Sequence, residues 1–494
     1  MRALTLLLLL TACAVSGSTG GRASLAEPAA PPAAGAAWEE ERHVRELLHQ
    51  AETWRGLRAK RRIQSRVLAE KDLAKAVDDS LRKDMPAGEL HSMEVALKAF
   101  GLIPESLDLE TFLPRLLTQQ IAGYYDPEEK TLSVILRGGG VLGGREEEAG
   151  LDSQRAEDMV LVHELTHALQ DQYFDLAAFA KTDPMSDAAT ARQALVEGDA
   201  TLTMLDALLG IPVEELPGAE HLLAAPLGAS EEWLAGGSQE LFDQAPAFIR
   251  ETLLFSYAQG NVFCISVRRK GGQKLLDHAF RSDPPRSSEQ ILHPEKWHGR
   301  RDDPVAVEWP DLAGALPGFA KVAEGEMGEL AIRILLREGL GDAARAETAA
   351  AGWGGDRFAV YQMEGPEGGR RLLAWITEWD SAEDAAELAA AVRQLGAGWR
   401  TEGPAEGPGK EQTKRVIVLK GTQGDITPRQ AAALLERLGK AGAKRPANRD
   451  IDLAALGIRD EDRAGADPEK LRKLLEDPAL RQRLEGLTGV TPPP

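Results

Sequence analysis

The ten residues HELTHALQDQ, from His163 to Gln172, constrain the fold of this 494-residue chain more than any other stretch. Two histidines stand four positions apart, and an α-helix places such a pair about 40° apart, one turn above the other. Apolar residues recur at helical spacing around them and would bury the rest of the helix surface. They are Met159, Val160, Val162, Leu165, Ala168 and Leu169. We therefore predict a helix from Asp158 to about Asp175 with both histidines on one side.

The residue types in this motif are those of a metal site. Two imidazoles on one side of a helix can bind a single zinc ion together. Glu164 lies about 100° round the helix from His163, so it stands beside such an ion without needing to bind it. Zinc lowers the pKa of a bound water to about 7, and a neighbouring carboxylate can then accept its proton. The pattern predicts that His163 and His167 bind the metal and that Glu164 is the catalytic base.

A catalytic zinc site takes three protein ligands and leaves one position open. No third histidine follows shortly after His167. A second helix, predicted over residues 187–209, carries Glu197 within the stretch ALVEGDA, thirty positions after His167. We expect Glu197 to be the third ligand, with Asp199 as the main alternative, and one zinc ion per chain.

This layout resembles that of the gluzincins, the thermolysin-like branch of the zinc metallopeptidases, whose third ligand is a glutamate on the following helix. The resemblance implies a zincin-like catalytic domain in which His163, His167 and Glu197 bind the metal. Glu164 matches the base of that family. The stretches AGYYDPEEKTLSV, SSEQILHPEKW and GWGGDR are also similar to those of exported bacterial proteins described as zinc metallopeptidases, over most of residues 40–380.

One position departs from the gluzincin pattern. That branch usually carries an aspartate four residues after its third ligand, where the carboxylate orients the first histidine. This chain has Thr201 at the corresponding position. Asp199 and Asp206 are the nearby acids that could take the orienting role.

The residues before the motif read as a β-hairpin, with strands at Tyr124-Tyr125 and Thr131–Leu136. In zincins the strand before the active-site helix forms the edge along which a peptide docks in extended form. We expect Thr131–Leu136 to take that role as an exposed edge strand. Peptide hydrolysis also needs a donor for the developing oxyanion, and Tyr257 and His293 are the candidates.

The N-terminus, MRALTLLLLLTAC, is typical of an export signal. Its apolar run, residues 3–10, is too short to span a bilayer, and Leu10-Thr11-Ala12-Cys13 resembles the bacterial lipobox. We expect a signal peptide over residues 1–12, a lipid on Cys13 and a flexible tether over residues 13–37. The predicted location is therefore the cell envelope, with the exported chain anchored to a membrane through Cys13. The alternatives are secretion with cleavage elsewhere, or a buried N-terminal strand or helix.

The overall charge limits the partners that this chain can bind. The formal net charge is −20 and the pI is near 5.1, which argues against nucleic acid, because phosphate binding needs a basic surface. The exception is the basic stretch Trp54–Arg66, which reads as a solvated helix face or as a contact for anionic lipid. The expected partner is a peptide or protein substrate. No feature of the sequence sets an oligomeric state.

The order of predicted elements indicates an α+β fold: a mainly helical, zincin-like catalytic domain with a small sheet, followed by a smaller α+β domain. We expect a helical region over residues 38–120, the metallopeptidase domain over 121–310 and the α+β domain over 311–440. Three strands of that last domain are predicted at residues 357–363, 371–379 and 416–420, with Gly352–Arg357 as a loop entering its sheet. Residues 441–494 read as a polar, helical or frayed tail.

Together these patterns predict an exported, membrane-tethered zinc peptidase that hydrolyses peptide bonds through a metal-activated water. The alternative is a catalytically silent lipoprotein of zincin fold that acts as a binding or assembly factor. A third possibility is a latent enzyme whose N-terminal or C-terminal region covers the cleft. A helical binding protein without metal is the simplest alternative.

Overall fold

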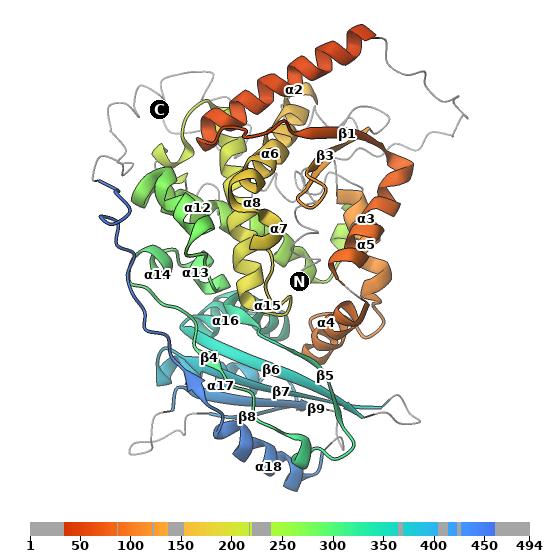
Figure 1. The fold of residues 1–494 in the computed structure, drawn as a ribbon. Coiled ribbons are helices and arrows are strands. Elements are labelled where there is room, and N and C mark those ends of the chain that lie inside the picture. The colour runs from red at the N-terminus through yellow and green to blue at the C-terminus, as the bar shows by residue number, and fades with distance from the viewer. Residues whose placement is uncertain are drawn as a thin grey trace.

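The computed structural model describes residues 34–85, 87–120, 123–136, 153–216, 218–219, 239–363, 369–403, 413–421 and 426–459. The predicted signal peptide, Cys13 and most of the predicted tether lie outside these residues. The fold is α+β, as expected, with a mainly helical part followed by a smaller unit built on a five-stranded sheet. In Figure 1 the helical part lies above that sheet. Within the described ranges, no helix has the length and apolarity that crossing a membrane requires.

Four helices form the centre of the upper part: α2 (Ala34–Arg55), α6 (Ser153–Phe174), α8 (Asp187–Leu209) and α12 (Ala247–Arg281). Helix α8 packs along α12 and against α6, and α2 lies across α6 (Figure 1). Helix α12 bends at Gly271 and Gly272, where Gly272 has a φ of +63° that favours glycine. The predicted helices around the HELTHALQDQ motif and around Glu197 are both present, as α6 and α8.

A small three-stranded sheet lies beside α6, in the order β1-β3-β2. Its strands are β1 (Gln64–Ala69), β2 (Gly123–Asp126) and β3 (Thr131–Leu136). The predicted hairpin is present, because β2 pairs with β3 in antiparallel fashion. The expectation that Thr131–Leu136 is an edge strand is wrong, since β1 pairs with its other side in parallel. The free edges among the described strands belong to β1 and β2.

Strand β1 also corrects two expectations for the N-terminal region. Residues 38–120 are not wholly helical, and the basic stretch is not a helix face, since α2 ends at Arg55 and the chain runs irregularly into β1. The partner of Gln64 is Thr131, 67 positions along the chain, so local periodicity could not reveal this strand. The helices α3 (Glu70–Asp84), α4 (Ala87–Phe100) and α5 (Leu109–Gln120) complete the region.

Five short helical segments lie between these long helices or after them: α7 (Leu176–Phe179), η1 (Val213–Glu215), α11 (Gln239–Gln244), α13 (Ser288–Leu292) and α14 (Glu295–His298).

The C-terminal unit is an antiparallel sheet in the order β5-β6-β7-β9-β8. Its strands are β5 (Ala320–Gly325), β6 (Trp353–Met363), β7 (Arg370–Trp379), β8 (Trp399–Glu402) and β9 (Arg415–Gly421). Its helices are α15 (Gly328–Leu340), α16 (Ala343–Ala350), α17 (Ala382–Val392), α18 (Pro428–Gly439) and the 3₁₀ turn η2 (Ala313–Ala315). The three predicted strands are confirmed, but the predicted loop Gly352–Arg357 is wrong, because β6 already begins at Trp353.

The hydrophobic core crosses the predicted boundary at residue 310. Phe100, at the end of α4, makes edge-to-face contacts with Phe358 at 5.0 Å and Trp375 at 5.4 Å, both on the sheet. These residues belong to the same buried cluster as the helices around α6, whereas a second cluster fills the opposite face of the sheet under α18. The helical part and the sheet are therefore packed against each other through a shared core.

Residues 441–459 pack against the rest of the described chain, which differs from the predicted helical or frayed tail. A short strand β10 (Ala443–Lys444) pairs with β4 (Ala306–Val307). Further along, the Asp450 carboxylate accepts a hydrogen bond from the Arg301 amide at 3.0 Å, and Ile458 is buried in the first core. Residues 441–459 thus run back along the helical part; residues 460–494 lie outside the described ranges.

Candidate metal centre

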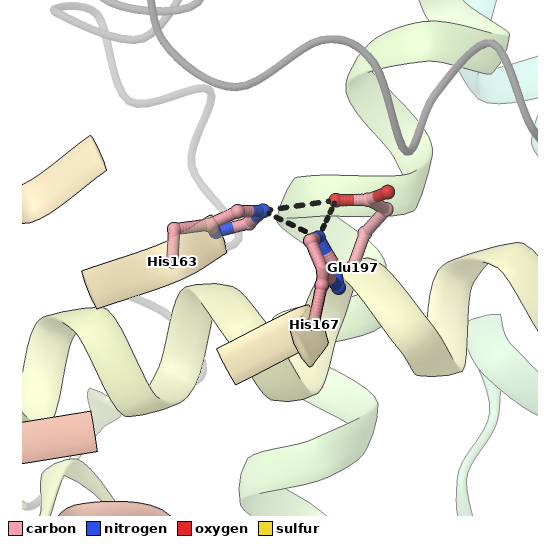
Figure 2. A group of neighbouring side chains, drawn as sticks. All are labelled: His163, His167 and Glu197. Carbon is pink, nitrogen blue, oxygen red and sulfur yellow. Dashed lines mark hydrogen bonds and ion pairs between the residues drawn. The ribbon is translucent and has the colours of Figure 1, made fainter. Parts of the chain in front are cut away.

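Helices α6 and α8 bring three predicted ligands together. Nε2 of His163 lies 2.9 Å from Nε2 of His167, and Oε2 of Glu197 lies 3.1 Å from the first nitrogen and 3.4 Å from the second. Figure 2 shows the three side chains converging from the two helices. The three donor atoms thus converge on a single point, as the ligands of one ion do.

All three side chains are inside the protein, with 1%, 0% and 0% of the surface of His163, His167 and Glu197 exposed. Burial lowers the pKa of His163. Burial also acts to lower the pKa of His167, but the negative charge of Glu197 outweighs it and raises the pKa to about 9. Burial acts to raise the pKa of the Glu197 carboxyl. The two nearby histidines outweigh burial and lower that pKa. The carboxylate is thus the charge that balances this buried group.

The hydrogen bonds around His167 favour a metal-binding tautomer. The Gln170 amide donates from Nε2 to Oδ2 of Asp199 at 2.8 Å and to the Val196 carbonyl at 3.1 Å. Its Oε1 must therefore accept, and the partner at 2.8 Å is Nδ1 of His167. A proton on Nδ1 leaves the lone pair of Nε2 facing His163 and Glu197. Two imidazole nitrogens and one carboxylate oxygen form a donor set that suits zinc.

Asp199, the alternative ligand, lies in the layer behind the histidines. Its Oδ2 accepts from Gln170 and, at 2.6 Å, from Nε of the fully buried Arg55 at the end of α2. Arg55 also contacts the Asp277 carboxylate at 2.9 Å and Oε1 of Gln273 at 3.1 Å, both on α12. Asp199 therefore reaches His167 only through Gln170, within a buried network that joins α2, α6, α8 and α12.

The second acid considered for that role, Asp206, is engaged elsewhere. It accepts from Arg268 at 2.6 Å and from the Val213 amide at 2.7 Å. On the first histidine, Nδ1 of His163 is buried and has no hydrogen-bond partner among the described residues. Neither Asp199 nor Asp206 orients the first histidine in the way that the gluzincin pattern would require.

Glu164 is on α6, on the side of the helix that faces the small sheet. Its Oε2 accepts a hydrogen bond of 2.7 Å from the Tyr125 amide of β2, while Oε1 is buried without a partner in the described structure. Burial raises the pKa of the Glu164 carboxyl to about 8. A divalent cation nearby would favour the ionised form. The sheet thus holds Oε2 of Glu164, whereas Oε1 has no hydrogen bond to the described residues and can accept one.

The position of Glu197 depends on a close approach between helices. Gln193, one turn earlier on α8, donates from Nε2 to Oε1 of Glu197 at 2.7 Å. The next residue, Gly198, lies against Gly260 of α12, and a Cβ added to Gly198 would come within 2.1 Å of the Gly260 backbone. The absence of side chains at this point lets the backbones of α8 and α12 touch.

The two candidate oxyanion donors lie in different places. The Tyr257 ring on α12 has its centroid 6.0 Å from that of His163, so it remains beside the centre. His293, after α13, contacts Oε1 of Glu329 on α15 at 3.0 Å instead. The structure therefore keeps Tyr257 as the neighbour of the predicted ligands and gives His293 a structural partner.

A second group of acids does not form a comparable site. Glu289, Asp302 and Asp380 surround the ammonium of Lys296 at 2.5, 3.2 and 3.0 Å. The lysine already supplies the positive charge that these carboxylates need. The group therefore reads as an ion-pair cluster joining α13 and α14 to the end of β7.

Sequence reasoning did not identify Gln170, Arg55 or the Tyr125 amide as parts of the centre. Gln170 was within reach of such reasoning, because a residue three positions after His167 lies on the same side of the helix. Arg55 and Tyr125 come from segments 112 and 42 positions before His167, and only the tertiary structure brings them close.

Comparison with known proteins covers part of the C-terminal unit. Residues 317–432 match a family described as a domain of unknown function (DUF8575). No curated protein and no solved structure matches the chain. The matched residues include the five-stranded sheet and exclude α6 and α8, so this similarity does not bear on the candidate metal centre.

Proposed function

We propose that this protein is a zinc-dependent peptidase. Two features together carry the proposal. Three possible metal ligands converge on one point, and beside them Glu164 has one buried carboxylate oxygen without a hydrogen-bond partner among the described residues. Structural zinc sites are usually closed by four protein ligands, whereas catalytic sites keep three ligands and an open position. His163, His167 and Glu197 would hold the ion, one per chain.

The residues around the ion have distinct roles in this proposal. Zinc bound there would act as a Lewis acid on a water molecule and on the scissile carbonyl. Glu164 would accept a proton from a water molecule through Oε1, while the Tyr125 amide holds Oε2 in place. Gln170 holds the proton of His167 on Nδ1, which keeps Nε2 free to bind. Tyr257 is the candidate donor to the developing oxyanion.

The substrate and location belong to the same proposal. A peptide or protein is the substrate class, and nucleic acid is disfavoured by the net charge of −20. Export and a lipid anchor on Cys13 rest on the N-terminal sequence, outside the described residues. Within the cell envelope, such an anchor would hold the enzyme at a membrane surface.

A second candidate function is favoured by one observation. Glu164 and the three predicted ligands are 0–1% exposed, so a peptide reaches them only after part of the surrounding chain moves. A zincin-type protein that binds metal without hydrolysis, and serves as a binding or assembly factor, would have the same buried centre.

Elemental analysis combined with a peptide-cleavage assay separates these functions. For the peptidase we expect about one zinc per chain in the native protein and in Glu164→Gln. The Glu164→Gln variant should lose hydrolysis by about 10²- to 10⁴-fold, because only the base is removed. Glu197→Ala should lose the zinc, whereas Glu347→Ala, on the exposed side of α16, should keep it.

The other outcomes are equally informative. Zinc in the native protein without cleavage of any peptide in a random library would support the second candidate. A native protein that takes up no zinc on incubation would contradict both functions and leave the histidines as core residues.

A further inference from the structure

A cavity of about 640 Å³ lies between the end of α4 and the five-stranded sheet. Its walls come from α4, from Glu105 and from strands β7, β8 and β9 with the residues next to them. Among the described residues, neither α6 nor α8 lines this cavity. It is therefore a feature of the C-terminal unit and α4, separate from the candidate metal centre.

The charge of the lining is strongly biased. Four cations line the cavity, and Glu105 is the one carboxylate among its described lining residues. The cations are Lys98, Arg371, Arg400 and Lys420. Lys98 is paired with Glu94 at 2.7 Å, and Nη1 of Arg371 with Glu105 at 2.8 Å. Arg400 and Lys420 make no hydrogen bond or ion pair with the described part of the chain, so neither cation is bonded to a carboxylate there.

Lys420 is held in the cavity by the sheet. It lies on β9, in register with Leu373 of β7 on one side and Trp399 of β8 on the other. Its Nζ stands 4.6 Å from the centroid of the Trp399 ring. Burial lowers the pKa of Lys420 to about 8. An ammonium that is partly removed from water and lies over a ring, with no carboxylate hydrogen-bonded to it, gains from an added anion.

Arg371 supplies a further unused donor. Its Nε is buried and has no hydrogen-bond partner in the described structure, although Nη1 of the same guanidinium is bound to Glu105. Arg371 and Lys420 are close enough for the arginine charge to contribute to the lowered pKa of the lysine. The charge of Glu105 also acts on Lys420, so one carboxylate serves two cations at this wall, which leaves positive charge for an added anion.

We propose that this cavity binds a small, multivalent oxyanion, such as a phosphate or a polycarboxylate, through Lys420 and Arg371, with the exposed Arg400 of β8 adding positive charge. Guanidinium and ammonium groups bind the oxygens of both chemical classes. A volume of about 640 Å³ is in the usual range for small-molecule sites. Most of the lining falls in residues 317–432, so the site gives the C-terminal unit a ligand-binding role that is independent of peptide hydrolysis.

Calorimetric titration of the full chain tests the proposal, with inorganic phosphate and citrate as separate probes at low ionic strength. We expect saturable binding of one anion per chain by at least one probe, and the tighter probe identifies the oxyanion class. Lys420→Met and Arg400→Gln should each weaken binding about tenfold or more, because each removes a charged donor. Arg429→Gln is the matched control, since Arg429 is an exposed cation on α18 that does not line the cavity.

Thermal unfolding accompanies the titrations. Lys420→Met should unfold at the native temperature or above it, because it removes an unpaired ammonium. If that variant does not fold, Arg400→Gln decides, since Arg400 is exposed. The proposal is overturned if the native chain binds neither probe, or if Arg400→Gln binds as well as the native chain. Equal weakening in Arg429→Gln would also overturn it, because binding would then reflect general surface attraction.

Discussion

Gln170 sets the orientation of one histidine in the candidate metal centre. It lies one turn beyond His167 on α6, accepts from Nδ1 of that histidine and donates to Asp199. Both ends of the amide are therefore used, and the orientation of the imidazole is set by a neutral side chain. In many zinc sites a carboxylate or a backbone carbonyl has this role.

At this scale the first prediction concerns Gln170→Leu. Removing the acceptor releases the proton of His167 from Nδ1, so we expect the zinc affinity to fall about 10- to 100-fold. A competitive titration against a chromogenic chelator measures this affinity. Gln172→Leu, two positions along the same helix and bound to the loop at Lys60, is the control and should retain native affinity. Native affinity in Gln170→Leu would remove this residue from the centre.

At the scale of elements, Arg55 ties α2 to the helices that carry the ligands. Its guanidinium contacts Asp199 of α8 at 2.6 Å and Asp277 of α12 at 2.9 Å, and its side chain is fully buried. Helix α2 is therefore part of the support of the candidate metal centre.

For Arg55→Met we expect a loss of about 3–5 kcal/mol in the free energy of unfolding, because the buried Asp199 and the partly buried Asp277 carboxylates lose their partner. Chemical denaturation measures this loss. Arg58→Met is the matched control: its side chain is 71% exposed and pairs with Glu52, so its removal should change stability by less than about 1 kcal/mol. Similar stabilities for the two variants would show that the buried network contributes little.

The contact between α8 and α12 leads to a prediction for Gly260. A Cβ at this position would lie 2.0 Å from the Ala194 carbonyl oxygen, so the helices must separate to accept a methyl group. We expect Gly260→Ala to destabilise the fold by about 1–3 kcal/mol or more. It should also lower zinc affinity, since Glu197 precedes the contact residue Gly198.

Gly88→Ala on α4 provides the comparison for Gly260→Ala. A Cβ at Gly88 meets no atom within 4 Å, so that variant should be neutral or stabilised by up to about 1 kcal/mol. Thermal unfolding and chelator competition on both variants separate helix propensity from the helix contact. An unchanged stability in Gly260→Ala would mean that the helices can separate at little cost.

At the scale of the whole molecule, buried acids lie where the helical part meets the sheet. Glu326 accepts a hydrogen bond from the Asp187 amide at the start of α8. Asp356 of β6 accepts from two indoles and from the backbone amides of Met327 and Gly328. Burial, assisted by the charge of Asp356, raises the pKa of Glu326 to about 7. This junction therefore prefers a protonated Glu326.

The sign of the resulting pH dependence follows from proton binding. Between the ordinary pKa of 4.5 and the folded-state value of about 7, the folded protein binds the Glu326 proton more tightly than the unfolded chain does. The free energy of unfolding therefore falls as the pH rises through this window, by at most about 3 kcal/mol. Glu326→Gln should reduce this fall and exceed the native stability at pH values above the folded-state pKa. Denaturation at acid and alkaline pH measures this change in the free energy of unfolding. Glu402→Gln, at an exposed position of β8, is the control.

The fold was predictable where the signal is local. Helices α6 and α8, the β2–β3 hairpin and strands β6, β7 and β9 follow from apolar periodicity and from turn residues between them. Strand β1 was missed, because its pairing with β3 spans 67 positions. The start of β6 at Trp353 was missed as well, because the glycines in GWGGDR are typical of a loop. In the structure Gly355 is part of β6 and packs against the Val305 backbone.

The sequence by itself determined the spacing of His163, Glu164 and His167 and the expectation of a partner at Glu197, because helix geometry converts four-residue spacing into a shared side. Only the tertiary structure decided which acid stands with the histidines. It places the Glu197 carboxylate beside them and binds Asp199 to Arg55 and Gln170. The physical reason is that ligand choice depends on where α2, α8 and α12 cross, and such crossings are set by packing between segments far apart in the chain.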